Sequence, residues 1–208
     1  MRRIRIGVLA SGGGTNLQAI IDSCERGEID GDVVVAISNV PEAYALERAR
    51  KHGIPAFAFP HKGMTREAHD ADIMACLEQH SVDLVVLAGY LRMLTPVIVT
   101  KYSGRMMNTH PALLPSFGGE GMHGLHVHQA VLDYGCKVSG CSIHFVTEAV
   151  DGGQIILQKA VPVLEGDTAE VLQERVLKEE HKLFPRAVQL FAQGKLKVEG
   201  RKCRVLES

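Results

Sequence analysis

The N-terminal half of the chain alternates short apolar runs with amphipathic runs of helical period. Residues Arg5–Leu9, Val33–Ser38 and Asp83–Gly89 are dominated by Val, Ile, Leu and Ala. A strand with one face in water would alternate apolar and polar residues, so we expect these strands to be covered on both faces. Strands that alternate with helices in this way form parallel sheets. The pattern therefore predicts an α/β fold.

The helical patterns lie between the apolar runs. Predicted helices span Asn16–Arg26, Glu42–His52 and Arg66–His80, and Gly53 is positioned to end the second. Pro55–Phe59 is expected to form a short strand between the second and third helices. The strand–helix rhythm is thus regular as far as the strand at Asp83–Gly89.

The rhythm changes after about residue 105. Arg105–Thr109 reads as a brief strand, and the Gly- and Pro-rich stretch Pro111–Gly124 is expected to be irregular. Two longer strand patterns follow, Val138–Thr147 and Gln154–Val163, and only Glu148–Gly153 joins them. Because this connection is too short for a crossover, the two strands are expected to be antiparallel.

A final amphipathic helix is predicted at Thr168–Gln193, with Asp167 and Thr168 as capping residues. The whole pattern predicts a Rossmann-like open twisted sheet, with a parallel N-terminal half, a mixed or antiparallel C-terminal half and helices on both faces. We expect one domain over residues 1–208, with a phosphate-binding half at 1–104 and a catalytic half at 105–208.

The charge and composition of the chain indicate which kinds of molecule it binds. The net charge of −1 and a pI near 6.8 give no electrostatic reason to bind nucleic acid or an anionic membrane. No apolar run approaches membrane-spanning length, and the N-terminus lacks the pattern of a signal peptide. The five cysteines are scattered, which favours free thiols in a reducing cytoplasm. We therefore expect a cytoplasmic protein, monomer or homodimer, whose other partners are small molecules.

A glycine-rich segment, Ser11-Gly12-Gly13-Gly14-Thr15-Asn16, lies between the first predicted strand and the first predicted helix. Backbone N–H groups at a helix start favour an anion, and glycine lets a phosphate approach closely. The segment is neither a dinucleotide fingerprint, because residue 17 is Leu, nor a P-loop, because the lysine is missing. The alternative is an ordinary tight turn capped by Thr15 or Asn16.

Three polar side chains predict acyl-transfer chemistry. Asn108 and His110 fall at the carboxyl end of a predicted strand, where open α/β sheets bind ligands, and Asp151 lies in the later strand connection. An amide can hold a carbonyl oxygen, an imidazole can move a proton, and a carboxylate can set the charge of that imidazole. None is an obvious nucleophile, which favours direct transfer between two substrates. The alternative is that these side chains bond only to local backbone.

Five motifs, taken in order, resemble the folate-dependent phosphoribosylglycinamide formyltransferase family over essentially the whole chain. They are Ser11–Gln18, Leu87–Arg92, Asn108–Pro115, Ser142–Val146 and Asp151–Gly153. The resemblance implies the formyltransferase fold and a one-carbon transferase of de novo purine biosynthesis. Its members transfer formyl from the cosubstrate 10-formyltetrahydrofolate to the glycyl amine of 5′-phosphoribosylglycinamide and require no metal.

The resemblance also implies roles for individual residues. Asn108 would hold the formyl oxygen, His110 would be the cationic or acidic partner, and Asp151 would raise the pKa of His110 and assist a water relay. The expected ribonucleotide contacts are Gly12, Gly13, Gly14, Thr15, Asn16 and Glu180. The expected folate contacts are Arg66, Leu91, Arg92, Met93, Leu94, Asn108, Thr147 and Asp151.

Some of these assignments have plain alternatives. Leu91–Leu94 could be core residues after a buried strand, and Arg66 could lie on a solvated helix face. Leu177 stands where the family pattern suggests a polar or basic residue, and Ser116–Gly124, the mobile loop of the family, is a few residues longer than in some relatives. His123, His126 and His128 lie close together in the sequence and are candidate metal ligands, but no Cys or carboxylate completes an evident site.

Three classes of function remain open on the residues. The first is the ribonucleotide formyltransferase. The second is another folate enzyme with the same three residues, either a 10-formyltetrahydrofolate hydrolase with an N-terminal regulatory domain or a formyl-methionyl-tRNA-forming enzyme with a basic C-terminal domain. The third is a ribonucleotide-binding module without catalysis. The length of the chain favours the monofunctional formyltransferase.

Overall fold

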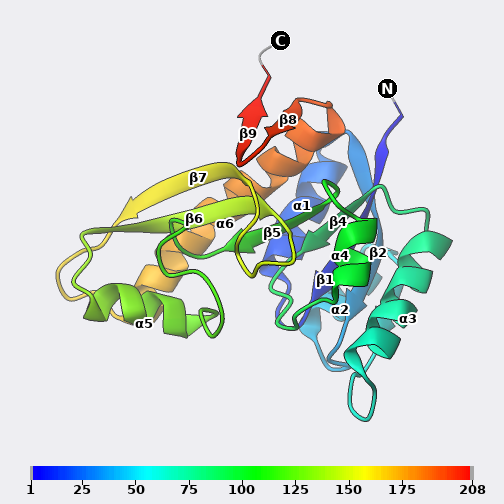
Figure 1. Cartoon of the computed structure of the whole chain (residues 1–208), viewed down its shortest axis with the longest axis horizontal. Coiled ribbons are helices and arrows are strands. Elements are labelled where there is room, and N and C mark those ends of the chain that lie inside the picture. Colours follow the sequence, from blue (N-terminus) through cyan, green and yellow to red (C-terminus); the bar gives the residue numbers. More distant parts are fainter. Residues whose placement is uncertain (1, 207–208) are drawn as a thin grey trace. The chain divides into compact units, whose positions relative to one another are not determined.

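The computed structural model describes residues 2–206, which divide into two compact units, one ending at Asn108 and one beginning at Thr109 (Figure 1). In chain order, the first unit contains β1 (Ile4–Ala10), α1 (Thr15–Glu25), β2 (Gly31–Ser38), α2 (Tyr44–Lys51), β3 (Ala56–Ala58), α3 (Arg66–Gln79), β4 (Leu84–Leu87), α4 (Pro96–Lys101) and most of β5 (Met106–His110). The second unit contains the end of β5, α5 (Leu125–Asp133), β6 (Val138–Phe145), β7 (Ile155–Pro162), α6 (Ala169–Ala192), β8 (Leu196–Glu199) and β9 (Lys202–Val205).

The strands of the first unit are parallel and lie in the order β3-β2-β1-β4-β5. The chain moves from β1 outward to β3, then returns to the other side of β1 and moves outward to β5. Because parallel crossovers are right-handed, this reversal places α1 and α2 on one face of the sheet and α3 and α4 on the other (Figure 1). The carboxyl ends of β1 and β4 therefore flank a topological switch point, where such sheets bind ligands.

The core of the first unit explains why its strands are so apolar. All four residues of β4 are buried, and the last five residues of β1 are buried as well. Side chains with almost no exposure, including Leu17 and Ile20 from α1 and Leu46 from α2, cover the sheet. Strands covered on both faces require apolar residues at every position, as the sequence pattern predicted.

In the second unit, β6 and β7 are antiparallel and follow β5 in the strand order of one seven-stranded sheet. The register runs from Val138↔Pro162 to His144↔Ile155. Helix α6 packs on this pair, and Leu172 and Val176 join Val131, Cys141 and Val161 in a buried cluster. The predicted mixed sheet with a parallel N-terminal half is thus confirmed.

Most predicted elements are present with shifts of a few residues at their ends, and Pro111–Gly124 forms no helix or strand. The hydroxyl of Thr168 accepts a hydrogen bond from the Val171 N–H at 3.4 Å, which confirms the predicted cap of α6. Helices α4 and α5 and the β8–β9 hairpin were not predicted. Helix α4 is only six residues long and the hairpin strands only four each, so none of them gives a clear period. Within residues 2–206, no helix combines the length and apolar character needed to cross a membrane.

Candidate functional site

The glycine loop enters α1 through Gly14, which has φ +69° and takes the N-cap position. No side chain caps this helix, so the alternative of a turn capped by Thr15 or Asn16 is wrong. A Cβ on Gly14 would lie 2.6 Å from the Cβ of Ala45. Glycine is therefore required here for both its conformation and its close approach to α2.

The carbonyl oxygens of the loop are bonded to the protein. The N–H of Ala45 donates to the Gly12 oxygen at 3.0 Å, and the Arg48 guanidinium donates to the Gly13 oxygen at 2.8 Å. Gly12 and Gly13 are exposed, and no atom lies within 4 Å of a Cβ built on either. An uncapped helix start with its neighbouring carbonyls occupied, and with a guanidinium nearby, has the character of an anion site.

Ser11 joins the loops that follow three strands of the first unit. Its hydroxyl donates to the Asn39 side-chain oxygen at 2.6 Å and accepts from the Leu91 N–H at 2.9 Å, while its own N–H donates to the Gly89 oxygen at 3.0 Å. Asn108 pairs with Leu87 in the β4–β5 ladder and thus ends at the same edge. The glycine loop, the segment after β4 and Asn108 therefore share the carboxyl edge of one parallel sheet.

The segment after β4 presents apolar side chains to solvent. Leu91 is 63% exposed and Met93 is 47% exposed, while Arg92 and Leu94 are half-buried. Core packing is therefore the wrong interpretation of Leu91 and Met93. The segment is fixed at its far end, where the Thr95 N–H donates to the buried Asp70 carboxylate at 2.6 Å. An apolar surface backed by polar anchors suits a largely apolar ligand.

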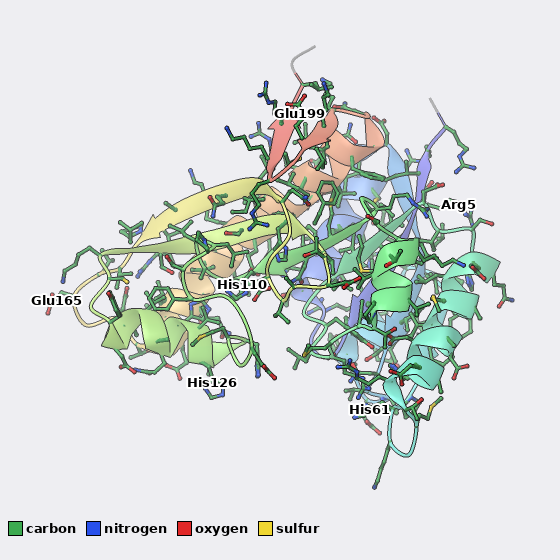
Figure 2. All side chains as sticks on the ribbon, in the orientation of Figure 1. Arg5, His61, His110, His126, Glu165 and Glu199 are labelled. Atoms are coloured by element: carbon green, nitrogen blue, oxygen red, sulfur yellow. The ribbon has the colours of Figure 1, made fainter. Side chains whose placement is uncertain are left out.

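In the second unit the structure brings His110 and Asp151 together. Figure 2 labels the His110 side chain. Nδ1 of His110 lies 3.4 Å from Oδ2 of Asp151, and its Nε2–H donates to the Phe117 carbonyl at 2.7 Å. The Gly119 N–H donates to the same Oδ2 at 2.9 Å. The imidazole–carboxylate distance is within ion-pair range but longer than a strong hydrogen bond. Distances of this kind commonly shorten when substrates bind.

Burial and charge act in opposite directions on these two groups. Burial lowers the pKa of His110 below its usual value, although the Asp151 carboxylate raises it as predicted from the sequence. Burial also tends to raise the pKa of Asp151, but hydrogen bonds from His144 and the Gly119 N–H, with the charge of His110, bring it below the usual value. At neutral pH the resting site therefore holds an ionised Asp151 beside a neutral His110.

A second histidine, not assigned a role from the sequence, contacts the same carboxylate. Nε2 of His144 lies 3.6 Å from Oδ1 of Asp151, and Nδ1 of His144 lies 2.9 Å from the Phe145 carbonyl. His144 and Ser142 alternate on β6 and so share a face with each other. This spacing of two polar residues on a mostly buried strand was the signal available in the sequence.

Ser142 orders the segment that follows His110. Its hydroxyl donates to the Ala112 oxygen at 2.7 Å and accepts from the Leu114 N–H at 3.0 Å, and the Gln158 amide donates to both the Ser142 hydroxyl and the Leu114 oxygen at 2.9 Å. The irregular chain after β5 therefore has its backbone groups paired by β6 and β7. This pairing fixes the start of the loop that carries Phe117 and Gly119.

The remaining predicted site residues lie in different settings. Glu180 is buried on α6 and accepts a hydrogen bond from the Thr109 hydroxyl at 3.0 Å. Thr109 lies on β5 between Asn108 and His110, so this bond places Glu180 beside that strand. Thr147 follows β6 and donates to the Ala149 oxygen at 3.3 Å. Arg66 is exposed at the first position of α3.

Two other groups bear on the chemistry of the second unit. The Cys141 thiol lies near Glu180, and burial raises its pKa to about 12, so it stays protonated. His123 and His126 meet edge to face, with ring centroids 5.7 Å apart, while His128 is buried. Among the residues described, no three His, Cys, Asp or Glu side chains gather as metal ligands.

Several known proteins are similar to this chain over nearly its whole length. The formyl transferase family model matches residues 4–188. The phosphoribosylglycinamide formyltransferase of Escherichia coli is 42% identical over 196 residues, which cover 94% of this chain and 90% of that protein. The crystal structure of glycinamide ribonucleotide transformylase 1 from Symbiobacterium toebii superposes with a TM-score of 0.94 at 50% identity, covering 99% of this chain and 95% of that one.

A longer relative is also similar. The trifunctional purine biosynthetic protein adenosine-3 of Bos taurus is 47% identical over 209 residues, covering 99% of this chain, and the chain spans 20% of that protein's length. The family match thus includes β1 to most of α6, with the glycine loop, Asn108, His110 and Asp151 inside it. The chain belongs to the formyl transferase family and, within it, to the phosphoribosylglycinamide formyltransferases.

Proposed function

We propose that this protein transfers the formyl group of 10-formyltetrahydrofolate to the glycyl amine of 5′-phosphoribosylglycinamide, a step of purine biosynthesis. The observation that carries the proposal is the contact of His110 with Asp151 at the end of the strand that also carries Asn108. An amide, an imidazole and an ionised carboxylate on adjacent segments match the needs of acyl transfer to an amine.

Asn108 and His110 are two residues apart on β5, so their side chains leave the strand on the same face. In the proposed reaction the substrate amine attacks the formyl carbon, and negative charge develops on the formyl oxygen. The Asn108 amide donates to this oxygen. The N–H of His110 that now bonds to the Phe117 carbonyl would turn to the oxygen as well, which requires segment 117–119 to move.

Asp151 would take part in the transfer of the proton from the attacking substrate amine. Attack leaves a positive charge on the substrate nitrogen, and the nearby ionised carboxylate accepts its proton through water. The proton then passes to the departing folate nitrogen. His110 takes up its second proton from solvent once the substrates are bound, because the negative charge that builds on the formyl oxygen and the Asp151 carboxylate both favour its imidazolium form. A positioned acid or base of this kind contributes roughly 10²–10⁴-fold in rate.

The proposal involves no covalent intermediate on the protein. The thiol of Cys141, on the same strand as His144, is buried and protonated, and neither Asn108 nor the resting His110 is placed as an activated nucleophile. Much of the acceleration therefore has to come from holding the amine and the formyl carbon in attack geometry.

The ribonucleotide 5′-phosphate would bind the glycine loop, where Gly12, Gly13, Gly14, Thr15 and Asn16 supply backbone and side-chain donors. The geometry that supports this assignment is the uncapped start of α1 and the engagement of the loop carbonyls by α2. Glu180 would assist the ribose or glycinamide end, through its contact with Thr109.

Folate would bind along the segment after β4. The exposed Leu91 and Met93, with Arg92 and Leu94, would flank the pterin. From the second unit, Thr147 to Asp151 would also contact the folate. Arg66, at the exposed start of α3, would meet the negatively charged glutamate tail. The free cysteines suit a reducing compartment, and we propose a cytoplasmic enzyme acting as a monomer or homodimer on small molecules.

The test is a spectrophotometric assay of folate product with both substrates present. We expect product only when the ribonucleotide is added. Product of equal rate without ribonucleotide would instead identify a 10-formyltetrahydrofolate hydrolase, and absence of product with both substrates would contradict formyl transfer to this acceptor.

A further inference from the structure

The β8–β9 hairpin follows the last residue that the family model matches, yet its turn lies against the turn that carries Asp151. The Arg201 guanidinium donates to the Gly152 carbonyl, one residue after Asp151. The Gln154 amide donates to the Gly200 carbonyl at 3.1 Å. Two hydrogen bonds in opposite directions therefore join the hairpin turn, Gly200–Arg201, to the segment 152–154.

The turn that carries Asp151 has an unusual backbone. Asp151 has φ +50°, a left-handed conformation that a residue with a Cβ rarely adopts. The Gly152 N–H donates to the Ala149 oxygen at 2.9 Å, and a Cβ on Gly153 would lie 1.6 Å from the Phe145 oxygen. This tight turn leaves the Gly152 carbonyl directed outward, where Arg201 binds it.

Arg201 lies in the turn of the hairpin, between two paired strands. Its ladder ends with the pair Glu199↔Lys202, and Gly200 has φ +58°, as the first position of a tight hairpin turn requires. Glu199 forms ion pairs with Lys197 at 2.8 Å and with Arg204 at 2.9 Å. The side chain of Arg201 therefore extends from a turn whose flanking strands are paired.

We propose that Arg201 is a positioning residue for formyl transfer, which fixes the Ala149–Gly153 turn through the Gly152 carbonyl so that Asp151 faces His110. The inference rests on the proposed role of Asp151. Its physical basis is distance: Asp151 is 3.4 Å from His110, and a displacement of about 1 Å in such a pair can cost a large factor in rate.

Arg201 acts by position rather than by charge. The groups that shift the pKa of Asp151 are burial, the hydrogen bonds from His144 and the Gly119 N–H, and the charges of His110 and His144. The guanidinium is exposed and is bonded to a backbone oxygen, not to the carboxylate. Its removal therefore has different consequences from the removal of a charge.

The experiment compares Arg201→Ala with Arg201→Lys and with the matched control Lys202→Ala. Lys202 is the next residue, at the start of β9, and is exposed, so its loss removes the same charge from the same hairpin. For Arg201→Ala we expect kcat to fall about three- to tenfold, with KM for the ribonucleotide and the melting temperature unchanged. Arg201→Lys, which keeps one donor within reach, should recover part of the loss, and Lys202→Ala should match the wild type. Equal kcat in Arg201→Ala and Lys202→Ala would overturn the proposal.

A second readout does not depend on turnover. The ring of His110 can be titrated by NMR, with the charged or titratable groups Asp151, His144 and His128 around it. If Arg201→Ala lets Asp151 move away, the pKa of His110 falls, whereas loss of a distant positive charge alone would raise it. A rise, or no change relative to Lys202→Ala, contradicts the proposal. If the wild type showed no formyl transfer but Arg201→Ala still lowered the pKa of His110, the proposed function would be refuted. The positioning contact between Arg201 and the Asp151 turn would still stand.

Discussion

The glycine loop of the first unit is formed by backbone groups, whereas the His110–Asp151 pair of the second unit is formed by side chains. The loop uses backbone: an uncapped helix start, two exposed glycines and one glycine with a positive φ, all in consecutive positions. The His110–Asp151 pair uses side chains from distant segments, joined through a loop and a turn whose backbones are fixed by β6 and the C-terminal hairpin.

The two sites should therefore be sensitive to different kinds of substitution. A backbone site tolerates changes of side chain except where a Cβ cannot fit. A side-chain site depends on the identity of each group and on every contact that fixes its position. Substitutions in the loop should therefore change binding or stability through sterics, whereas substitutions around His110 should change chemistry.

The largest expected effect is that of Asp151→Asn. The amide keeps the shape and an acceptor for the Gly119 N–H but loses the charge that favours imidazolium at His110, so we expect kcat to fall by roughly 10²–10⁴-fold. Steady-state kinetics measures this, and ribonucleotide affinity should survive because the glycine loop is untouched. Asp133→Asn, an exposed carboxylate on α5, is the control. Near-normal turnover in Asp151→Asn would remove the carboxylate from the proposed proton path.

Gly14→Ala tests the backbone site. The new Cβ would meet Ala45 in a left-handed conformation, so we expect the free energy of unfolding to fall by about 2–4 kcal/mol and KM for the ribonucleotide to rise. Gly12→Ala meets no atom within 4 Å, so its free energy of unfolding should change little. Urea unfolding compares the two. Unchanged affinity in a folded Gly14→Ala would argue against phosphate binding at this loop.

Ser142→Ala probes the support of the side-chain site. Loss of the hydroxyl leaves the buried Leu114 N–H and the Ala112 oxygen without this partner, and we expect a cost of about 1–3 kcal/mol in unfolding free energy. Ser139→Ala is a close control on the same strand, because its hydroxyl is buried but has no hydrogen-bond partner. Equal costs in the two variants would show that the Ser142 bonds contribute nothing to stability.

The smallest effect is a pH dependence of stability. Burial, with repulsion from His110, lowers the pKa of His128 to about 4. Between pH 6.5 and pH 4 the unfolded ring binds a proton that the folded ring does not, so stability falls as the pH falls through this window. Over the upper part of this window, down to about pH 5, we expect a loss of about 1–2 kcal/mol from this residue. Thermal melts across the window should show a shallower slope in His128→Gln, whereas the exposed control His123→Gln should retain the wild-type slope.

The elements of the fold that have a clear hydrophobic period could be predicted from the sequence. The buried runs in β1, β2 and β4 admit only a covered parallel sheet, and the short connection Glu148–Gly153 admits only an antiparallel pair. Helix α4, helix α5 and the C-terminal hairpin escaped prediction because they are short or partly exposed. Their stability comes from packing against the rest of the chain and not from local pattern.

The residues of the candidate site could be predicted more fully than their charge states, contacts and exposure. Asn108, His110 and Asp151 could be named from motifs, but no motif indicates that burial outweighs the carboxylate and lowers the pKa of His110. His144 was visible only as part of a motif. The exposure of Leu91 and Met93 also depended on the loop conformation, which Ser11 and Asp70 set from other segments.

The parallel sheet, the position of the glycine loop and the family could all be predicted from the residues alone, because each depends on residues that are consecutive or periodic along the chain. The groups that surround Asp151 and the charge of His110 at rest could be found only in the folded molecule. Desolvation and pairing depend on atoms from β5, β6, the loop after β5 and the turn after β6, and no local pattern contains the distances between them.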